Sequence, residues 1–293
     1  MTGATRPARS LLYVPGDREG WAEKAARSGA DALILDLEDA VAPPRKDEAR
    51  RLVGALTGAP PGSVAHQLWV RIDAAEPEDD LDAVVGPGLH TVVVPKAEPD
   101  LVDRVARRLD ELEARRSLRP GSVGVVALLE SARGIATVDQ VAAHPRVRRL
   151  AIGEADLAAE LGMVPGPDRE EMAPLRNRVV LASALAGIER PIGPVHTVLD
   201  DPDGLRRSCQ VQFRQGFRGR TAVHPRQVAV IAAEFAPTAE EVERARALLA
   251  EFEASRADGK AAYAGASGSL VDPATVRRAR EIVAEAAEGQ EES

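Results

Sequence analysis

The fold is decided by two stretches of sequence, Val125-Val-Ala-Leu-Leu-Glu130 and Leu150-Ala-Ile-Gly-Glu-Ala-Asp156. Each is an apolar, β-branched run that ends in a carboxylate, and a helical interval separates the two, which indicates consecutive buried strands of a parallel sheet. Because the carboxyl ends of parallel strands meet at one edge, we expect Glu130 and Asp156 to lie at the same rim. Taken singly, either residue is equally well explained as a helix N-cap or a solvated loop acid.

The rest of the chain repeats this alternation of strand and helix with short connections. We expect strands over residues 10–14, 32–37, 68–72, 91–94, 123–129, 147–152, 192–198 and 217–222. We expect helices over residues 18–28, 46–56, 81–85, 101–116, 138–143, 171–186, 204–215 and 226–235. Eight such units are typical of an α/β TIM (β/α)8 barrel, whereas a doubly wound sheet usually has fewer strands. The barrel is therefore predicted to occupy residues 1–236.

Residues 237–293 form a second region after the predicted barrel. A helix is expected over residues 238–256, where Thr238 as N-cap and Glu241 three residues later match a capping box. A glycine-rich segment, residues 257–273, separates it from a final helix over residues 274–287. Such a segment is either a linker or a lid over an active site.

Composition excludes several classes of protein. A formal net charge of −8 argues against nucleic-acid binding, which requires clustered Lys and Arg. The single cysteine, Cys209, cannot form an intramolecular disulfide, and we expect a buried structural thiol. No apolar stretch approaches the roughly 18 residues of a membrane helix, and the N-terminus lacks the apolar core of a signal peptide. We therefore expect a cytoplasmic protein with neither a membrane nor a nucleic-acid partner.

Charged side chains follow the predicted strands, at the end where barrel enzymes place their chemistry. They are Asp36, Glu38, Arg71, Lys96, Glu130, Asp156 and His224. Any one of them could belong to a structural ion pair, but charge from six strands at one rim is hard to explain by stability alone. Two carboxylates that leave the remaining metal positions to water and substrate favour Mg²⁺, or Mn²⁺, over zinc.

Six longer motifs follow one another along the chain. They are Arg9-Ser-Leu-Leu-Tyr-Val-Pro-Gly16, Asp31-Ala-Leu-Ile-Leu-Asp-Leu-Glu-Asp-Ala-Val41, Val94-Pro-Lys-Ala-Glu98, Ala127-Leu-Leu-Glu-Ser131, Asp201-Pro-Asp-Gly-Leu205 and Ala222-Val-His-Pro-Arg-Gln227. In these motifs the chain resembles the citrate lyase β-subunit-like acyl-CoA lyases of the HpcH/HpaI aldolase superfamily, from Arg9 to about Ala284. The resemblance implies a Mg²⁺-dependent lyase that cleaves a 3-hydroxyacyl-CoA, such as malyl-CoA or citramalyl-CoA, to acetyl-CoA and a 2-oxo acid, or catalyses the reverse.

The resemblance also implies roles for single residues. Glu130 and Asp156 would bind Mg²⁺, and Arg71 would lie against the carbonyl oxygen of the acyl thioester. Gly268-Ser-Leu-Val-Asp272 matches the family's lid loop. This implies that Asp272 transfers a proton in the active site of a neighbouring subunit, and that the protein is a homo-oligomer, either a trimer or a hexamer.

Three positions depart from the family pattern. Asp73 replaces the usual Asn after the third strand, and an extra carboxylate there would tighten metal binding or repel an anionic substrate. Ala155 stands where many members carry Glu, with Glu154 one position earlier, which alters the hydrogen bonding around the metal. Asp272 is followed by Pro-Ala instead of x-Pro.

Cleavage of the carbon–carbon bond leaves an enolate on the thioester, so the chemistry makes three demands. A metal must chelate the 2-oxo acid, a fixed cation must stabilise the enolate oxygen, and a carboxyl must move a proton. Glu130 and Asp156 meet the first demand as metal ligands. Arg71 meets the second because a guanidinium is always charged, and Asp272 on a closing lid meets the third.

Other residues are expected to support substrate binding. The backbone amides of Glu154, Ala155 and Asp156, at the start of a helix, are expected to hold the substrate carboxylate. We expect Arg9 and Lys96 near the polar groups of CoA. We expect Asp36 and Glu38 to support the site residues and His224 to have a structural role.

Three other functions stay open: a malyl-CoA thioesterase-like hydrolase, the β subunit of a citrate lyase complex, and a CoA-ester-binding protein without activity. Free CoA among the products would identify the hydrolase. Dependence on α and acyl-carrier partners would identify the citrate lyase subunit, and any turnover would exclude the third function. The sequence does not identify the acyl group of the substrate, because a hydrophobic pocket discriminates one methyl group by only about 1–3 kcal/mol.

Overall fold

The structure is a computed structural model that describes residues 8–60, 63, 66–257, 263–265 and 270–287. The chain divides into two compact units. One is Pro7–Phe235, and the other is Ala236–Ser293 together with Met1–Arg6.

The larger unit contains one sheet of eight parallel strands in the order β7-β6-β5-β4-β3-β2-β1-β8. The strands are β1 (Ser10–Pro15), β2 (Ala32–Asp36), β3 (Gln67–Arg71), β4 (Leu89–Val94), β5 (Gly124–Leu129), β6 (Val147–Ile152), β7 (Glu189–Ile192) and β8 (Arg220–Ala222). Gly193 forms a parallel bridge with Arg220, and its N–H donates to the Gly219 carbonyl over 2.8 Å. The sheet thus closes between β7 and β8, and the predicted barrel is confirmed.

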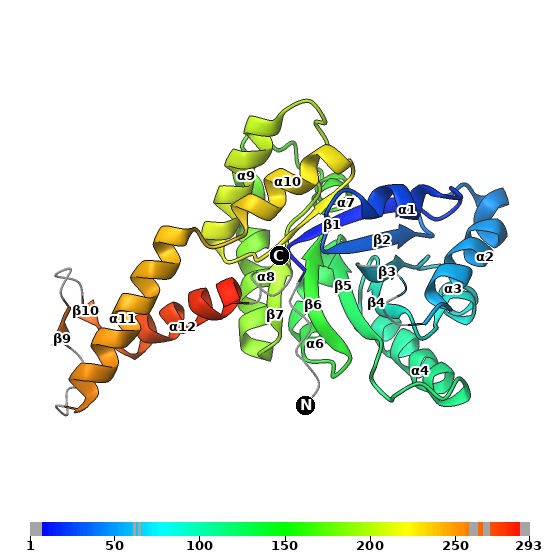
Figure 1. The fold of residues 1–293 in the computed structure, drawn as a ribbon. Helices are drawn as coiled ribbons and strands as arrows, with labels where there is room; N and C mark the ends of the chain where they lie inside the picture. Colours follow the sequence, from blue (N-terminus) through cyan, green and yellow to red (C-terminus); the bar gives the residue numbers. More distant parts are fainter. Residues whose placement is uncertain (1–7, 61–62, 64–65, 258–262, 266–269, 288–293) are drawn as a thin grey trace. The chain divides into compact units, whose positions relative to one another are not determined.

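Helices cover the outside of the barrel, and Figure 1 shows α2, α3 and α4 beside strands β2 to β4. The helices are α1 (Trp21–Ala26), α2 (Lys46–Thr57), α3 (Pro77–Val84), α4 (Pro99–Arg115), α5 (Ala132–Ala136), α6 (Val138–Ala142), α7 (Glu154–Glu160), α8 (Ala173–Ala186), α9 (Pro202–Gln215) and α10 (Pro225–Glu234), with 3-10 turns η1 (Pro43–Arg45) and η2 (Glu170–Met172). Four of them, α3, α4, α9 and α10, begin with proline. Proline suits this position because its fixed φ is helical and the N–H that it lacks would have no partner in the helix.

The alternation of side chains along each strand sorts the core into two layers. Residues such as Leu12, Leu33, Val70 and Val125 pack against the helices. The barrel interior is filled by a second cluster that includes Leu11, Ile34, Trp69 and Leu128. Two residues beyond these four, the same alternation brings Tyr13, Asp36, Arg71 and Glu130 to the carboxyl rim. On the inner side of these strands, apolar residues are therefore followed at the rim by one tyrosine and three charged residues.

Arg149 on β6 fills the opposite end of the barrel. It is 1% exposed, and its guanidinium donates to three backbone carbonyls, those of Arg190, Ala8 and Arg218, over 2.6, 2.5 and 2.8 Å. Burial lowers the pKa of Arg149 to about 10, so the side chain stays charged at neutral pH. These bonds tie β6 to β7 and to the segments that lead into β1 and β8. Arg149 therefore stabilises this end of the barrel, whereas barrel enzymes place their catalytic residues at the carboxyl rim.

The smaller unit is a pair of helices, α11 (Ala239–Ala257) and α12 (Pro273–Ala287), with a short antiparallel pair, β9 (Tyr263–Ala264) and β10 (Leu270–Val271). The predicted capping box of α11 is confirmed. Glu241 Oε2 accepts from the Thr238 N–H over 2.8 Å, and Thr238 Oγ1 accepts from the Glu241 N–H over 3.2 Å. Gly268, at the start of the lid motif, lies outside the described residues.

Several expected boundaries are wrong, among them the start of the third helix, at Pro77 instead of residue 81, and the start of the eighth strand, at Arg220 instead of residue 217. Two others have identifiable reasons. The seventh strand ends at Ile192 and does not run over 192–198. Gly193 and Pro194 follow, and proline cannot donate to a ladder, so the chain leaves the sheet there. Helix α1 begins at Trp21 instead of residue 18, because Gly20 has a φ of 74° and ends the preceding turn. No helix within the described ranges is long and apolar enough to cross a bilayer.

Candidate active site

Arg71 occupies the centre of the charged rim. Its Nε and Nη2 atoms donate to the two carboxylate oxygens of Asp36 over 2.7 and 2.5 Å. Its Nη1 atom lies 2.8 Å from Glu38 Oε2 and forms an ion pair with it, although the two groups are not aligned for a hydrogen bond. The guanidinium carbon also lies 5.0 Å from the centre of the Tyr13 ring. Burial opposes the charge of Arg71, but Asp36 outweighs it and raises the pKa of the guanidinium.

A chain of contacts leads from Arg71 to Glu130 through Glu38 and Lys96. Lys96 Nζ lies 3.2 Å from Glu38 Oε1, and the Lys96 backbone N–H donates to Glu130 Oε1 over 2.9 Å. Lys96 reaches this position with a φ of 47°, which is uncommon for a side chain with a Cβ. Burial, followed by the charges of Glu38 and Asp156, raises the pKa of Glu130 to about 8, against the opposing Lys96 N–H and Arg71.

Glu130 and Asp156 are the two residues predicted to bind a divalent cation. A Cβ on Gly153 would lie 2.5 Å from Glu130 Oε2, so glycine allows the carboxylate to lie against the backbone that leads into α7. Asp156, two residues into α7, is exposed at the rim. Arg71 is engaged by Asp36 and Glu38, and Lys96 by Glu38, so no Lys or Arg among the described residues forms an ion pair with Glu130.

The donor set fits Mg²⁺. Among the residues that the structure describes, no group of three or more His, Cys, Asp or Glu side chains could hold a metal. A closed zinc site is therefore not present in those residues. Two carboxylate oxygens, with the remaining positions filled by water and substrate, are the coordination that Mg²⁺ prefers.

Asp73 does not present a free carboxylate to this site. Its Oδ2 atom lies 2.8 Å from Lys46 Nζ, and its Oδ1 accepts from the Ala75 N–H over 2.9 Å. Lys46 also donates to the carbonyls of Leu37 and Glu38. Burial works against the charge of Asp73, but these donors outweigh it and lower its pKa. The charge that departs from the family pattern is thus balanced by a lysine.

Glu154 has its carboxylate engaged by arginines instead of open to a substrate. Its Oε1 accepts from Arg176 Nε over 2.5 Å, and its Oε2 lies 2.6 Å from Arg169 Nε. Ala155 is exposed at the first turn of α7, and the backbone amides of residues 154–156 lie in that turn, where a helix leaves its N–H groups without intrahelical partners. The side chain of Glu154 contributes no contact for a substrate there.

The structure does not bring Arg9 to the rim. Arg9 precedes β1, at the amino-terminal end of the strand, and its backbone N–H donates to Asp31 Oδ2 over 2.9 Å. The carboxylates of the site follow the opposite ends of their strands. Arg9 is therefore separated from them by the length of the barrel.

His224 and Asp272 both cap helices. His224 Nδ1 accepts from the Arg226 N–H over 3.1 Å at the start of α10, in keeping with the structural place expected for it. Asp272 Oδ1 accepts from the Ala274 and Thr275 N–H groups over 3.0 and 2.9 Å at the start of α12. These amides, those of Thr275 first, lower the pKa of Asp272. Asp272 belongs to the smaller unit.

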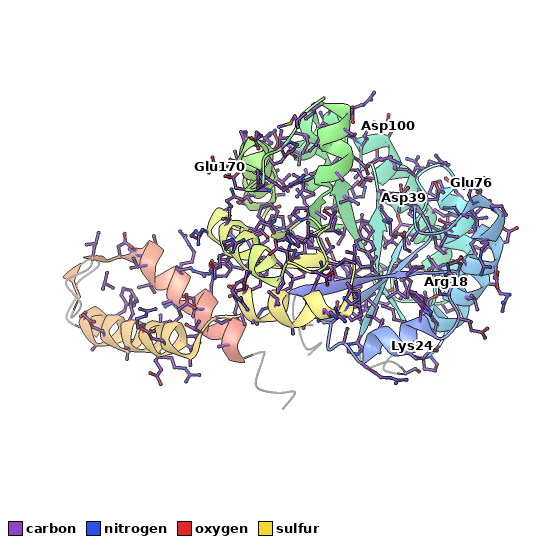
Figure 2. The ribbon with its side chains drawn as sticks, turned by 90° about the horizontal axis from the view of Figure 1, so that it is seen from above. Arg18, Lys24, Asp39, Glu76, Asp100 and Glu170 are labelled. Carbon is purple, nitrogen blue, oxygen red and sulfur yellow. The ribbon has the colours of Figure 1, made fainter. Side chains whose placement is uncertain are left out.

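Sequence reasoning missed two aromatic residues of the first β/α unit, Tyr13 on β1 and Trp21 at the start of α1. Tyr13 would have been found by extending the two-residue period of β1 to the rim, where it meets Arg71. Trp21 is 47% exposed, and the Arg18 guanidinium lies 5.9 Å from its ring. Figure 2 shows Arg18 and Lys24 on this side of the barrel. The available signal was a tryptophan within a strongly charged segment, residues 17–24, that follows the first strand.

A surface cavity of about 460 Å³ lies elsewhere, at the amino-terminal ends of β5 and β6. Asp103, Arg107, Asp110, His144, Arg146 and Arg148 line it. Because these residues lie at the opposite ends of the strands from Glu130 and Asp156, the cavity is not part of the rim site.

Comparison with known proteins identifies the class to which this barrel belongs. The family model described as HpcH/HpaI aldolase/citrate lyase matches residues 9–225. A (3S)-malyl-CoA thioesterase of Cereibacter sphaeroides is 34% identical over 290 residues, which cover 98% of this chain and 97% of the relative. An L-malyl-CoA/β-methylmalyl-CoA lyase of the same species is 33% identical over 310 residues, which cover 96% and 95%.

A solved structure has the same fold. The crystal structure of CitE from Mycobacterium tuberculosis, in complex with magnesium, acetoacetate and coenzyme A, superposes with a TM-score of 0.75 at 31% identity. The match covers 95% of this chain and 98% of that one. The chain belongs to the HpcH/HpaI aldolase/citrate lyase family of enzymes.

Proposed function

We propose that the protein is a Mg²⁺-dependent acyl-CoA lyase. Its reaction would cleave a 3-hydroxyacyl-CoA such as malyl-CoA or citramalyl-CoA to acetyl-CoA and a 2-oxo acid, or form it from them. The observation that carries this proposal is the rim itself, where a rigidly held arginine lies beside two carboxylates that suit a divalent cation. Relatives named as malyl-CoA enzymes support the choice of substrate class.

Arg71 would stabilise the enolate oxygen of the thioester. Two of the five N–H groups of a guanidinium are used by Asp36, and Nη1 faces Glu38. The remaining donors are held in a fixed orientation before substrate arrives. Such preorganised donors act where charge develops and require no reorganisation during the reaction.

Glu130 and Asp156 would hold the metal at the adjacent strand ends. Mg²⁺ bound there would chelate the 2-oxo acid and polarise its carbonyl group. The amides of residues 154–156, at the start of α7, would orient the substrate carboxylate. Asp272 would move the proton at the methyl carbon of acetyl-CoA, from the lid of a neighbouring subunit in a homo-oligomer.

The polar end of CoA would lie over the first strands of the barrel. Lys96 contributes a half-exposed ammonium group, and Arg18 with Trp21 offers a cation and an exposed ring. Arg9 has no place in this proposal, since it lies at the other end of β1.

The second candidate is a thioesterase, and the 34% identity to a (3S)-malyl-CoA thioesterase favours it. Both reactions need the same metal and thioester contacts, and they differ in whether water reaches the acyl carbon. Incubation of the protein with malyl-CoA and Mg²⁺ separates them. Acetyl-CoA with glyoxylate supports the lyase, and free CoA with malate supports the hydrolase. Dependence on added α and acyl-carrier proteins would instead identify a citrate lyase subunit.

Direct metal binding tests the site apart from turnover. We expect calorimetric titration to show Mg²⁺ or Mn²⁺ binding to the wild type, and weaker binding to Glu130→Gln and to Asp156→Asn, because each loses a charged ligand. Unchanged binding in both variants, or full activity in excess chelator, would falsify the assignment.

A further inference from the structure

The segment that carries Asp156 is anchored by a buried cluster of charges. Glu154 is 3% exposed, and both of its carboxylate oxygens are engaged. Arg176 on α8 donates from Nε to Oε1 over 2.5 Å and from Nη2 to Oε2 over 3.0 Å. Arg169, which precedes η2, adds a contact from Nε to Oε2 over 2.6 Å. One acidic side chain thus joins α7 to two separate segments.

Helix α7 needs such an anchor. It has seven residues, and a helix this short is not stable without tertiary contacts. Leu157 and Ala158 bury its apolar side, but the hydrophobic effect is non-directional and specifies the rotation of the helix less sharply than a hydrogen-bonded ion pair does. A two-point contact between Arg and a carboxylate has a fixed geometry and removes that freedom.

The anchor and the metal ligand lie on different sides of this helix. Residues advance by about 100° around a helix axis, so Glu154 and Asp156 point roughly 200° apart. The structure agrees, because Glu154 is buried against α8 whereas Asp156 is exposed at the rim. Fixing Glu154 therefore fixes where Asp156 points, without any contact between the two side chains.

We propose that Arg176, Glu154 and Arg169 form a positioning cluster that orients α7 so that Asp156 and Glu130 converge on one cation. The proposal rests on the metal site proposed above. It makes Glu154 a positioning residue, not a substrate contact. Loss of the cluster should weaken cation binding even though none of its members touches the cation.

A matched control exists in the same barrel. Glu113 on α4 is 1% exposed and is also paired with an arginine, Arg146, at 2.7 Å. It accepts from the N–H groups of Gly121 and Val123, which lead into the amino-terminal end of β5. Glu113→Gln thus removes a buried charge of the same kind from the end of the barrel that is remote from the rim.

The test compares Mn²⁺ affinity, by calorimetry or electron paramagnetic resonance, in wild type, Asp156→Asn, Glu154→Gln and Glu113→Gln. Residues that orient metal ligands typically change affinity by about 10- to 100-fold, so we expect Glu154→Gln to weaken binding by about tenfold or more. Glu113→Gln should bind as the wild type does, although both variants lose thermal stability. Arg176→Lys, which keeps the charge but loses the two-point contact, should fall between wild type and Glu154→Gln.

The other outcomes separate the two proposals. If wild type binds Mn²⁺, Asp156→Asn does not, and Glu154→Gln matches Glu113→Gln, the positioning cluster is overturned and the metal site stands. If wild type binds no cation, the proposed metal site itself fails. Should Glu154→Gln not fold, Arg176→Lys replaces it, since it keeps the charge beside Glu154 and loses only the two-point contact. Weaker Mn²⁺ binding in a folded Arg176→Lys supports the cluster, and unchanged binding overturns it.

Discussion

Arg71 is held on three sides before any substrate is present. Asp36 takes two of its N–H groups, Glu38 faces a third nitrogen, and Tyr13 covers the face of the guanidinium. Arginine can satisfy all of these contacts at once because its charge is planar and its donors form a rigid fork. Lysine keeps the charge but cannot reproduce the fork.

Arg71→Lys should therefore lower kcat more than it raises KM. The missing donors act on charge that develops during the reaction, and loss of one such donor typically costs about 100-fold or more in kcat. Steady-state kinetics with the acyl-CoA substrate measure the split, and a thermal melt establishes that the variant is folded. A defect confined to KM would make Arg71 a ground-state binding residue.

Glu113 should make the stability of the protein depend on pH. Burial opposes its ionisation, but Arg146 and the N–H groups of Val123 and Gly121 outweigh burial and lower its pKa below the ordinary 4.5. The stabilisation is thus present above the unfolded-state pKa and is lost as pH falls through the lower folded-state pKa.

Glu113→Gln should accordingly reduce the free energy of unfolding by about 1.5–3 kcal/mol at neutral pH, the range for a hydrogen bond to a charged group. The difference from wild type should shrink as the pH drops below the folded-state pKa. Urea denaturation of both proteins over a pH series measures it. A difference that stays constant with pH would mean that the Glu113 charge contributes nothing.

At the scale of the element, the residue that we propose as the proton carrier also begins a helix. Asp272 starts α12 by accepting from two backbone amides with one oxygen, so its proposed role as a proton carrier has to be separated from its role as a cap. Asparagine and aspartate cap helices equally well, whereas alanine does not. Substitution of Asp272 by asparagine and by alanine therefore distinguishes the two roles.

Asp272→Asn should keep the melting temperature of the wild type and lose turnover, because an amide cannot carry the proton. Asp272→Ala should lose turnover and also melt earlier. Circular dichroism and the lyase assay together give both readouts. If Asp272→Asn turns over like the wild type, its contribution is the cap alone.

At the scale of the whole molecule, the chain carries its proposed metal site and its proposed proton carrier in different compact units. The barrel unit holds Glu130 and Asp156, and the smaller unit holds Asp272. In a homo-oligomer one subunit's lid would complete another subunit's site. The two functions should then be separable between chains.

Mixing Asp272→Ala with Glu130→Ala, each inactive alone, should restore activity once subunits exchange. Some mixed sites would then combine an intact lid with an intact metal centre. Differently tagged variants establish that exchange has occurred. Exchange without activity, with both parents folded, would show that the lid closes on its own barrel or takes no part in catalysis.

Local patterns in the sequence determined the barrel and its charged rim. The two-residue period of β2, β3 and β5 alone is enough to bring Asp36, Arg71 and Glu130 to the inner side of the strand ends. The capping box at Thr238 was equally readable, because a helix start depends on residues three apart. Whether Glu130 and Asp156 bind a metal stays a prediction.

Tertiary structure alone decided what each buried or paired charge of the barrel faces. Glu154 pairs with Arg176 across 22 positions, Asp73 pairs with Lys46 across 27, and Arg149 reaches the Ala8 carbonyl across 141. A periodic pattern specifies the side of an element to which a residue points, but not the partner opposite. Because that partner comes from a distant segment that only the closed barrel brings near, the sequence could assign Glu154 to the rim but could not show that two arginines already occupy it.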